Sequence, residues 1–203
     1  MSHYFETPTG AANLREFRAT IFDRSFTFTS ADGVFSGSRL DLGTSVLLRS
    51  VDPPIATPNC PNPRLLDLGC GVGPIAIGLA TACPQAHVTA IDVNDRALEL
   101  TRLNAARAGV EVEALRPEDV DPDARFDEIW SNPPIRIGKP ALHDLLTTWL
   151  GRLAPAGRAY LVVGRNLGAD SLQTWALQGG WSAERLASAK GFRVLVVSVP
   201  ESC

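Results

Sequence analysis

The sequence is poor in the residues from which metal sites are built. It has four cysteines, without any Cys-x-x-Cys pair, and three histidines that lie far apart. These seven residues are Cys60, Cys70, Cys83, Cys203, His3, His87 and His143. A structural zinc site needs such residues at short, regular spacings, so we expect no metal. Reduced thiols in a cytosolic chain account for the cysteines more simply.

Long apolar runs are missing as well. The longest hydrophobic stretches are interrupted by glycine, proline or charge, and none approaches the ~20 residues of a membrane span. The first residues, Met1–Glu6, have neither the basic start nor the apolar stretch of a signal peptide. We therefore expect a cytoplasmic protein with no membrane partner.

An excess of positive charge is absent too. Nineteen Lys and Arg oppose 22 Asp and Glu for a net charge of −3, which argues against a polycation. Residues 110–130 carry eight acids and two arginines, whereas residues 131–203 carry eight basic and four acidic residues. The basic C-terminal third could meet a polyanion on one face, but charge alone favours an ordinary solvated surface.

What is present is a globular composition. The chain has 203 residues, 45% hydrophobic and 20% charged, which fits one domain with a small appendage. Residues 52–63 contain five prolines and can sustain neither a helix nor a central strand. We therefore divide the chain into an N-terminal cap (residues 1–51), a proline-rich linker (52–63) and a main domain (64–203).

Strand and helix signals alternate along the main domain. Strands are expected at residues 64–68, 87–91, 110–115, 126–131 and 158–163, and two more at 181–186 and 192–199. Helices are expected at residues 73–82, 94–108, 141–153 and 169–178. This alternation predicts an α/β fold, with a mostly parallel sheet and helices on both faces. The cap is expected to be β-rich, with strands at 18–22 and 25–29 around Asp23-Arg24 and a helix at 44–51.

A glycine loop, Asp67-Leu-Gly-Cys-Gly-Val-Gly73, joins the first of these strands to its helix. Glycines there allow a sharp turn and a close approach to a ligand, although a tight structural turn explains the loop equally well. Asp92 ends the next strand, 19 residues after Gly73, and a carboxylate there can accept two hydrogen bonds from a ribose diol. Loop and acid together favour an adenosine-containing cofactor. Pro74 stands where a dinucleotide fingerprint has glycine, which argues against NAD.

These residues resemble the first two motifs of class I S-adenosylmethionine-dependent methyltransferases. The resemblance implies a Rossmann-like sheet of seven mostly parallel strands whose last strand is antiparallel, and S-adenosyl-L-methionine as cofactor. It implies that Asp67 supports the loop and that Asp92, with Val93, binds the ribose. An acid after the third strand meets the adenine amine in this family, and Glu118 and Asp119 both remain candidates, with Glu118 preferred. The loop residues expected to contact the amino-acid part of the cofactor are Gly69, Cys70, Gly71 and Gly73.

A second motif, Ser131-Asn-Pro-Pro-Ile135, follows the fourth strand. Carboxyl ends of parallel strands share one edge of a sheet, so Asn132 should face the same crevice and border the cofactor. An amine on a nucleobase or amide is a poor nucleophile because its lone pair is delocalised. The Asn132 side-chain oxygen and the Pro133 carbonyl can accept its two N–H groups, with the backbone preset by Pro133 and Pro134. Taken alone, the motif fits a strand-ending turn better, but its place at this sheet edge favours the amine-binding role.

The Asn-Pro-Pro-aromatic pattern is typical of methyltransferases that modify adenine, guanine or glutamine nitrogen. This chain has Ile135 in the aromatic position, so the base must pack on an aliphatic side chain or on another ring. Phe35 and Phe192 are candidate rings, and both also fit a core role. Arg136 and Lys139 follow the motif directly; they suit phosphates beside a flipped base, or are ordinary surface charge.

Further motifs extend the resemblance nearly from end to end. They are Phe26–Thr29, Gly33–Ser36, Asp41–Thr44, Asn132–Lys139 and Lys190–Phe192. Together they resemble short, single-domain relatives of the bacterial 16S ribosomal RNA guanine-N2 methyltransferases. The resemblance implies methyl transfer to the exocyclic amine of a guanine, with ribosomal RNA or the small ribosomal subunit as partner. Larger members carry an additional methyltransferase-like domain, which we do not expect in 203 residues.

Other functions stay open. A protein glutamine or a small amine could be the acceptor instead of guanine, because the motif does not separate them. A cofactor-binding or RNA-binding module without turnover is a second alternative, although such a module would not need the amine acceptors of Asn132-Pro-Pro. An NAD dehydrogenase ranks last.

Overall fold

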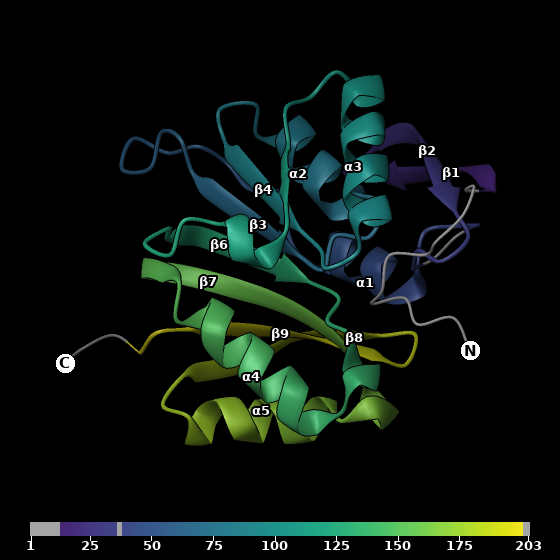
Figure 1. Cartoon of the computed structure of the whole chain (residues 1–203). Coiled ribbons are helices and arrows are strands. Elements are labelled where there is room, and N and C mark those ends of the chain that lie inside the picture. Colours follow the sequence, from purple (N-terminus) through teal and green to yellow (C-terminus); the bar gives the residue numbers. More distant parts are fainter. Residues whose placement is uncertain (1–12, 36–37, 201–203) are drawn as a thin grey trace.

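The computed structural model describes residues 13–35 and 38–200. A seven-stranded sheet forms its centre, in the order β5-β4-β3-β6-β7-β9-β8 (Figure 1). The strands are β3 (Arg64–Leu68), β4 (His87–Ile91), β5 (Glu113–Leu115), β6 (Phe126–Ser131), β7 (Leu153–Gly164), β8 (Ser182–Ala189) and β9 (Phe192–Ser198). From β5 to β7 neighbouring strands are parallel, and β9 lies antiparallel between β7 and β8. The predicted Rossmann-like fold, with seven strands and an antiparallel last strand, is confirmed.

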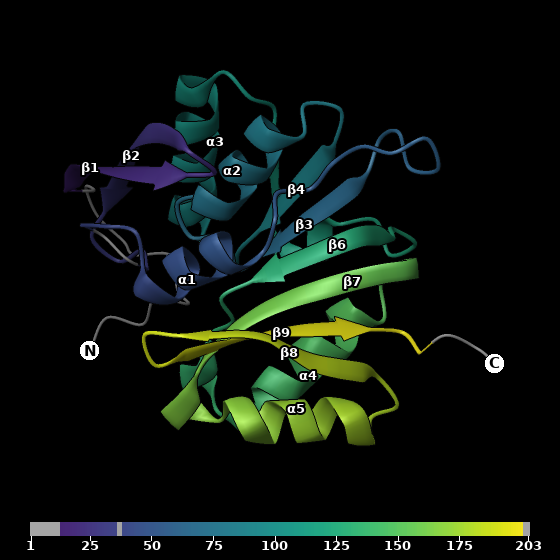
Figure 2. The ribbon, with the colours of Figure 1, turned by 180° about the vertical axis from the view of Figure 1, so that it is seen from behind.

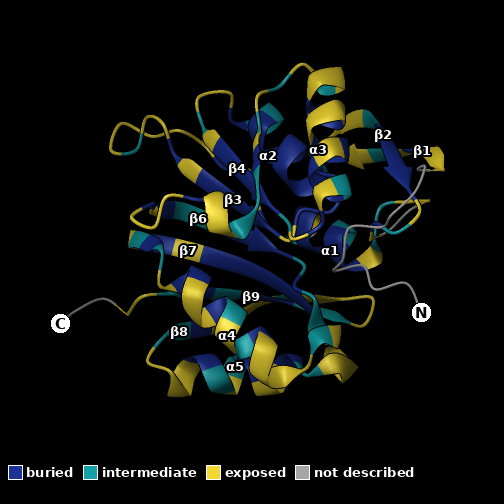
Figure 3. Cartoon of the chain, viewed as in Figure 1, coloured by how far each residue is buried: buried dark blue, intermediate teal, exposed yellow. Residues whose placement is uncertain are grey.

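Helices cover both faces of the sheet (Figures 1 and 2). One face carries α1 (Leu42–Ser50), α2 (Pro74–Ala82) and α3 (Asp95–Ala108), and the other carries α4 (Lys139–Leu150) and α5 (Ala169–Gln178). Successive strand residues alternate between the two apolar cores, as Val162 and Val163 do on β7. Figure 3 shows the central strands buried and the outer sides of α4 and α5 exposed. A sheet buried on both faces explains the continuous apolar runs of its strands.

A two-stranded antiparallel hairpin, β1 (Leu14–Ile21) and β2 (Arg24–Ala31), packs beside α3 (Figure 1). The strands are longer than predicted. The turn was predicted at Asp23-Arg24, and this was wrong: it lies at Phe22 and Asp23. Both turn residues have positive φ, 45° and 62°, as tight hairpins that match the strand twist require. The Phe22 ring packs edge-on against Trp130 at 6.3 Å, which compensates for an unusual backbone at an aromatic residue.

The observed element boundaries differ most from the predicted ones where a helix is followed by a strand. The strand expected over residues 110–115 starts only at Glu113. The preceding residues are used in leaving α3: Gly109 is left-handed, with φ 70°, and Val110 N–H donates to the Ala105 carbonyl at 3.1 Å. The helix expected over 141–153 ends at Leu150, because β7 already begins at Leu153.

The division into cap, linker and main domain stays a prediction. Phe17 and Phe28 of the hairpin stack at 5.3 Å and belong to the same apolar core as Ile75 and Leu79 of α2. Within the linker, Thr57 and Cys60 form an isolated antiparallel bridge. Among the residues described, no helix has the length and apolar character needed to cross a membrane.

Candidate active site

The predicted site residues meet at the carboxyl edge of three adjacent strands. Asp92 follows β4, Gly69 follows β3 and Asn132 follows β6, and these strands are neighbours in the order β4-β3-β6. After β3 the chain turns toward β5, and it returns on the other side of β3 with β6. Ligands of open α/β sheets bind at such a reversal of strand order.

A cleft opens at this edge. It is lined by the glycine loop from Gly69 to Val72, by Pro74 and Ile75 of α2, and by Asn132. Its remaining wall comes from the N-terminal part of the chain: Phe17, Phe35, Arg39, Leu40, Asp41 and Thr44. Of the two candidate rings, Phe35 therefore lies on the cleft, with 48% of its surface exposed. The segment before α1 and the glycine loop thus enclose one space.

Each glycine of the loop has a positive φ: 80° at Gly69, 57° at Gly71 and 86° at Gly73. A methyl group on Gly69 would meet no described atom within 4 Å, so this backbone faces open space. At Gly73 it would lie 2.9 Å from the Thr101 side chain of α3. Gly73 therefore serves helix packing, whereas Gly69 leaves the cleft accessible to a ligand.

Asp67 braces the loop from below. Its side chain is fully buried, and its Oδ2 accepts a hydrogen bond from Ala76 N–H in the first turn of α2 at 2.9 Å. Its Oδ1 is buried without a hydrogen-bond partner among the described residues. Burial raises the pKa of this carboxyl to about 7. Cys70, also expected in the loop, is buried with its Sγ 3.5 Å from Thr101 Oγ1.

Asp92 ties the loop to the start of α3. Its Oδ2 accepts from Gly71 N–H at 3.0 Å and its Oδ1 accepts from Asn94 N–H at 2.9 Å. Desolvation by burial raises the pKa of Asp92, and backbone hydrogen bonds from Asn94, Gly71 and Val93 oppose that rise. Val93, the next residue, is 41% exposed.

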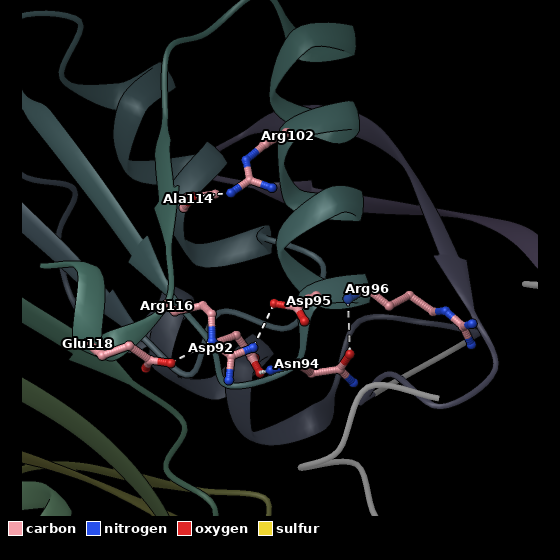
Figure 4. Close-up of polar contacts among 8 residues, drawn as sticks. All are labelled: Asp92, Asn94, Asp95, Arg96, Arg102, Ala114, Arg116 and Glu118. Carbon is pink, nitrogen blue, oxygen red and sulfur yellow. Dashed lines mark hydrogen bonds and ion pairs between the residues drawn. The ribbon is translucent and has the colours of Figure 1, made fainter. Parts of the chain in front are cut away.

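The two acids considered for the adenine amine lie in the short 3-10 helix Pro117–Asp119 after β5, and neither lines the cleft. Glu118 accepts a hydrogen bond from Arg116 at 2.7 Å, and the same guanidinium pairs with Asp95 at 2.7 Å (Figure 4). Arg116 lowers the pKa of Glu118. Glu118 is thus engaged by a cation, and the choice between it and Asp119 stays a prediction.

Asn132 is held by residues that the sequence reasoning gave no role. Its Nδ2 donates to Asp41 Oδ1 at 2.7 Å and to Thr44 Oγ1 at 3.1 Å. Asp41 Oδ1 also accepts from Thr44 N–H at 3.1 Å and so caps α1. Both amide hydrogens are therefore used, and the remaining polar atom of the side chain, Oδ1, is an acceptor.

The absence of a side chain at Gly43 allows the Phe192 ring to lie close to Asn132 and Asp41. A methyl group built on Gly43 would lie 3.0 Å from Phe192 Cε1, 3.0 Å from Asp41 Oδ1 and 3.3 Å from Asn132 Oδ1. The edge of the Phe192 ring and the amide oxygen of Asn132 thus surround one glycine. Phe192 is partly buried and packs against the apolar core, as a core residue would. Its ring edge also lies near Asn132, where a ring that contacts a base is expected.

The other residues of the Asn-Pro-Pro motif lie beside the cleft rather than in its wall. The Pro133 carbonyl accepts from Ile135 N–H at 2.9 Å, which uses one of its two lone pairs. Ile135 packs against the core beneath α4. Arg136 and Lys139 are exposed, in the 3-10 turn Ile135–Ile137 and at the first residue of α4.

Two buried asparagines attach the N-terminal hairpin to this site. Asn104 of α3 exchanges hydrogen bonds with the backbone of Thr29, at 2.7 and 2.9 Å, and donates to the Val72 carbonyl of the loop at 3.0 Å. Asn94 donates to the Gly33 carbonyl at 2.9 Å. Sequence reasoning missed both contacts, because neither the N-cap position of Asn94 nor the helical position of Asn104 gives a sign of the distant partner.

The model of the methyltransferase small domain family matches residues 25–196. Uncharacterized protein YbxB of Bacillus subtilis (strain 168) is 34% identical over 173 residues, 83% of this chain and 84% of that protein. Ribosomal RNA small subunit methyltransferase C of Stutzerimonas stutzeri (strain A1501) is 34% identical over 148 residues, 72% of this chain but 43% of that protein. The chain thus spans less than half the length of that enzyme.

Solved structures show the same fold. The T. thermophilus 16S rRNA N2 methyltransferase RsmC, in complex with AdoMet and guanosine, aligns with a TM-score of 0.80 and 24% identity, over 95% of this chain and 52% of that one. A ribosomal protein L11 methylase from Lactobacillus delbrueckii subsp. bulgaricus aligns with a TM-score of 0.63 and 20% identity, over 80% and 84%.

Proposed function

This chain belongs to the methyltransferase small domain family, and from that premise we propose that it transfers a methyl group from S-adenosyl-L-methionine to the exocyclic N2 amine of a guanine in 16S ribosomal RNA. Family membership makes it a methyltransferase. The identity of the methyl acceptor is what we propose beyond family membership. A ribosomal substrate would also mean a cytoplasmic protein that contacts ribosomal RNA or the small subunit.

The described residues fit the cofactor. Gly69 faces open space at the mouth of the cleft, as a backbone that approaches a ligand closely must. The glycine loop would hold the amino-acid part, and the Asp92 carboxylate, which follows β4 at the same sheet edge, would hold the ribose. When bound, S-adenosyl-L-methionine supplies an activated methyl group on a sulfonium. The side chains at this edge therefore need to position the acceptor rather than to activate the donor.

One observation carries the choice of an amine as acceptor. Asp41 and Thr44 take both amide hydrogens of Asn132, so the Asn132 side chain presents Oδ1, an acceptor, rather than its NH2 donor. An N–H of the target amine can donate to this oxygen, and its second N–H can donate to the Pro133 carbonyl, which keeps one lone pair. Positive charge grows on the nitrogen as it is methylated, so both acceptors hold it more strongly then than before.

Guanine in ribosomal RNA is supported by the relatives. The Stutzerimonas stutzeri relative is a small-subunit ribosomal RNA methyltransferase, and the T. thermophilus structure contains guanosine. Phe192 beside Asn132 offers a ring edge where the sequence motif has Ile135 in place of an aromatic residue. The fold is shared with a ribosomal protein methylase as well, so a protein acceptor is the alternative that an experiment has to separate.

The test supplies S-adenosyl-L-methionine with a tritiated methyl group to the purified protein, together with naked 16S ribosomal RNA, small ribosomal subunits, or a protein extract. We expect label in the RNA or subunit fractions only, and N2-methylguanosine after nuclease digestion and mass spectrometry. Label confined to protein or to small amines would reject guanine as the acceptor. Comparing the ribosomal RNA of a deletion strain with wild type then identifies the nucleotide.

A further inference from the structure

A second hollow lies at the tip of the β8–β9 hairpin, on the same edge of the sheet as the proposed active site. The turn at Lys190-Gly191 joins β8 to β9. Because β9 is antiparallel to β7, this turn lies beside the carboxyl end of β7, where Gly164 pairs with Phe192. Arg165 N–H donates to the Gly191 carbonyl at 2.8 Å and closes the hollow from the β7 side. We call this hollow the hairpin groove.

The hairpin groove is strongly basic. Arg165, Arg185, Lys190 and Arg193 all line it, with no acid in its lining. Arg193 is paired with Asp170 of α5, whereas the other three are exposed and form no ion pair within residues 13–35 and 38–200. Three exposed cations without acidic partners give the groove a positive potential that attracts an anion.

One residue, Phe192, lies between the hairpin groove and the proposed active site. Phe192 lines the hairpin groove, and its ring edge also lies against Gly43, next to Asn132 Oδ1. The cofactor side of the site, at β3 and β4, lies on one side of Asn132, and β7, β9 and β8 lie on the other. Along the sheet edge, the cofactor side of the site and the hairpin groove thus lie on opposite sides of Asn132.

We infer that the hairpin groove binds the sugar–phosphate backbone of single-stranded RNA next to the target nucleotide. Arg165, Arg185 and Lys190 contact the phosphates, and the partly buried Phe192 supports the base at the junction of groove and active site. This inference rests on the proposed function. It adds a phosphate-binding surface separate from Arg136 and Lys139, and a base that is pulled out of an RNA stack needs its neighbours held in this way.

The experiment measures the binding of a short, fluorescently labelled single-stranded RNA over a range of KCl concentrations. The test protein carries Arg165→Gln, Arg185→Gln and Lys190→Gln, which remove charge but keep side-chain length. The matched control carries Arg18→Gln, Arg24→Gln and Arg125→Gln. These are also exposed and also form no ion pair among the described residues, but they lie on the β1–β2 hairpin and before β6.

For single-stranded nucleic acids, each phosphate contact contributes about −0.7 to the slope of the logarithm of the binding constant against the logarithm of the salt concentration. Removing three such contacts should therefore make the slope of the test variant about 2 less steep, and the slope of the control should hardly change. Calorimetric titration with S-adenosyl-L-methionine should give the same affinity for all three proteins, which shows that the site is intact. An unchanged salt slope in the test variant, while the wild type still methylates RNA, would overturn the groove and leave the proposed function standing.

Two further outcomes complete the test. A wild type that binds no single-stranded RNA would overturn the groove, and the methyl-transfer assay decides the proposed function separately. A reduced slope together with methylation of protein would support the groove and reject the proposed acceptor. Polyglutamate serves as the competitor that separates RNA from an acidic protein. Displacement of the RNA by polyglutamate at equal charge concentration would overturn the assignment to RNA.

Discussion

Asn132 and Asp41 are 91 residues apart in the chain, and the amide nitrogen of the first donates to the carboxylate of the second at 2.7 Å. An asparagine amide can turn over and exchange its oxygen for its NH2 group, which would present a donor to the incoming amine. An ionised Asp41 carboxylate can only accept hydrogen bonds, so it selects the orientation in which the Asn132 NH2 group faces it. Thr44 adds a second contact at 3.1 Å.

Asp41→Ala should therefore slow methyl transfer through Asn132 while leaving S-adenosyl-L-methionine binding nearly unchanged. Loss of one preorganised polar group slows a reaction by on the order of 10²–10³. Asp41→Ala only allows the Asn132 amide to turn, so its effect should not exceed this range. Asp41→Asn keeps an acceptor and a helix cap, so it should restore much of the rate. If both variants lose the same activity and the same stability, Asp41 serves only the cap of α1.

Gly43→Ala tests this geometry with a single methyl group. Alanine in place of glycine within a helix favours folding by up to about 1 kcal/mol, which offsets part of the cost of crowding this buried position, so the thermal midpoint is measured beside the rate. The added methyl group would lie 3.0 Å from Asp41 Oδ1 and from the Phe192 ring, which is tighter than ordinary contact, so one of these neighbours has to shift slightly. We expect slower methyl transfer and normal cofactor affinity. Full activity of a normally folded Gly43→Ala protein would show that this geometry is not needed.

Asp92→Ala should weaken S-adenosyl-L-methionine binding. A hydrogen bond to a charged group contributes roughly 1.5–3 kcal/mol, which corresponds to about tenfold to over a hundredfold in affinity. The variant also releases Gly71 N–H from its partner at 3.0 Å, so the larger effect is expected. Asp123→Ala, at an exposed acid, is the matched control. Equal affinities of wild type and Asp92→Ala by calorimetry would remove Asp92 from the cofactor site.

Asp67 should make the stability of the free protein depend on pH. Burial raises its pKa in the folded state from the ordinary 3.8 to about 7, so the folded protein binds this proton more tightly than the unfolded chain. Its contribution is fully present below pH 3.8 and is lost as the pH rises through about 7. Urea titrations from about pH 4 to about pH 8 should show falling stability in wild type.

In the same titrations, Asp67→Asn should flatten this decline without abolishing it, because burial also raises the pKa of Asp92, which acts in the same direction. The two curves are compared by slope, since the substitution places an amide group where Asp67 Oδ1 is buried without a partner among the described residues. Parallel curves would mean that Asp67 titrates in its ordinary range.

The sequence predicts those parts of this molecule that depend on neighbours along the chain. The alternation of strands and helices, the glycine loop and the acid after β4 all belong to this class. The partners of Asn132 do not: Asp41 has the pattern of a helix cap, and nothing near it indicates a strand end 91 residues later. Asn104 is similar, because its bonds to Thr29 and Val72 exist only once the hairpin has packed on α3.

The roles expected for Arg136, Lys139, Glu118 and Asp119 stay predictions for a related reason. All four are exposed, so their positions follow neither from a hydrophobic pattern nor from packing. Glu118 has a partner in Arg116, but the pairing of surface charges reflects local geometry more than function. Only a bound ligand, or the variants that disturb it, can assign such residues.

Asn132→Ala separates chemistry from cofactor binding. It removes the acceptor that holds the target amine, and this acceptor matters most as the nitrogen gains positive character, so transfer should slow by on the order of 10²–10³. The cofactor is expected to contact mainly Gly69, Gly71 and Asp92, and its affinity should change much less. Asn62→Ala, at an exposed asparagine before β3, is the matched control.

The measurement is single-turnover methyl transfer beside a titration with S-adenosyl-L-methionine, on one preparation of each variant. Near-normal transfer by Asn132→Ala would refute its catalytic role. An equal collapse of transfer and cofactor affinity would mean that Asn132 supports the structure of the site, because the same substitution also leaves Asp41 and Thr44 without their shared donor. Only a slow transfer with intact binding fits an oxygen that acts on the acceptor, since an amine that is badly held reacts slowly however well the methyl donor is placed.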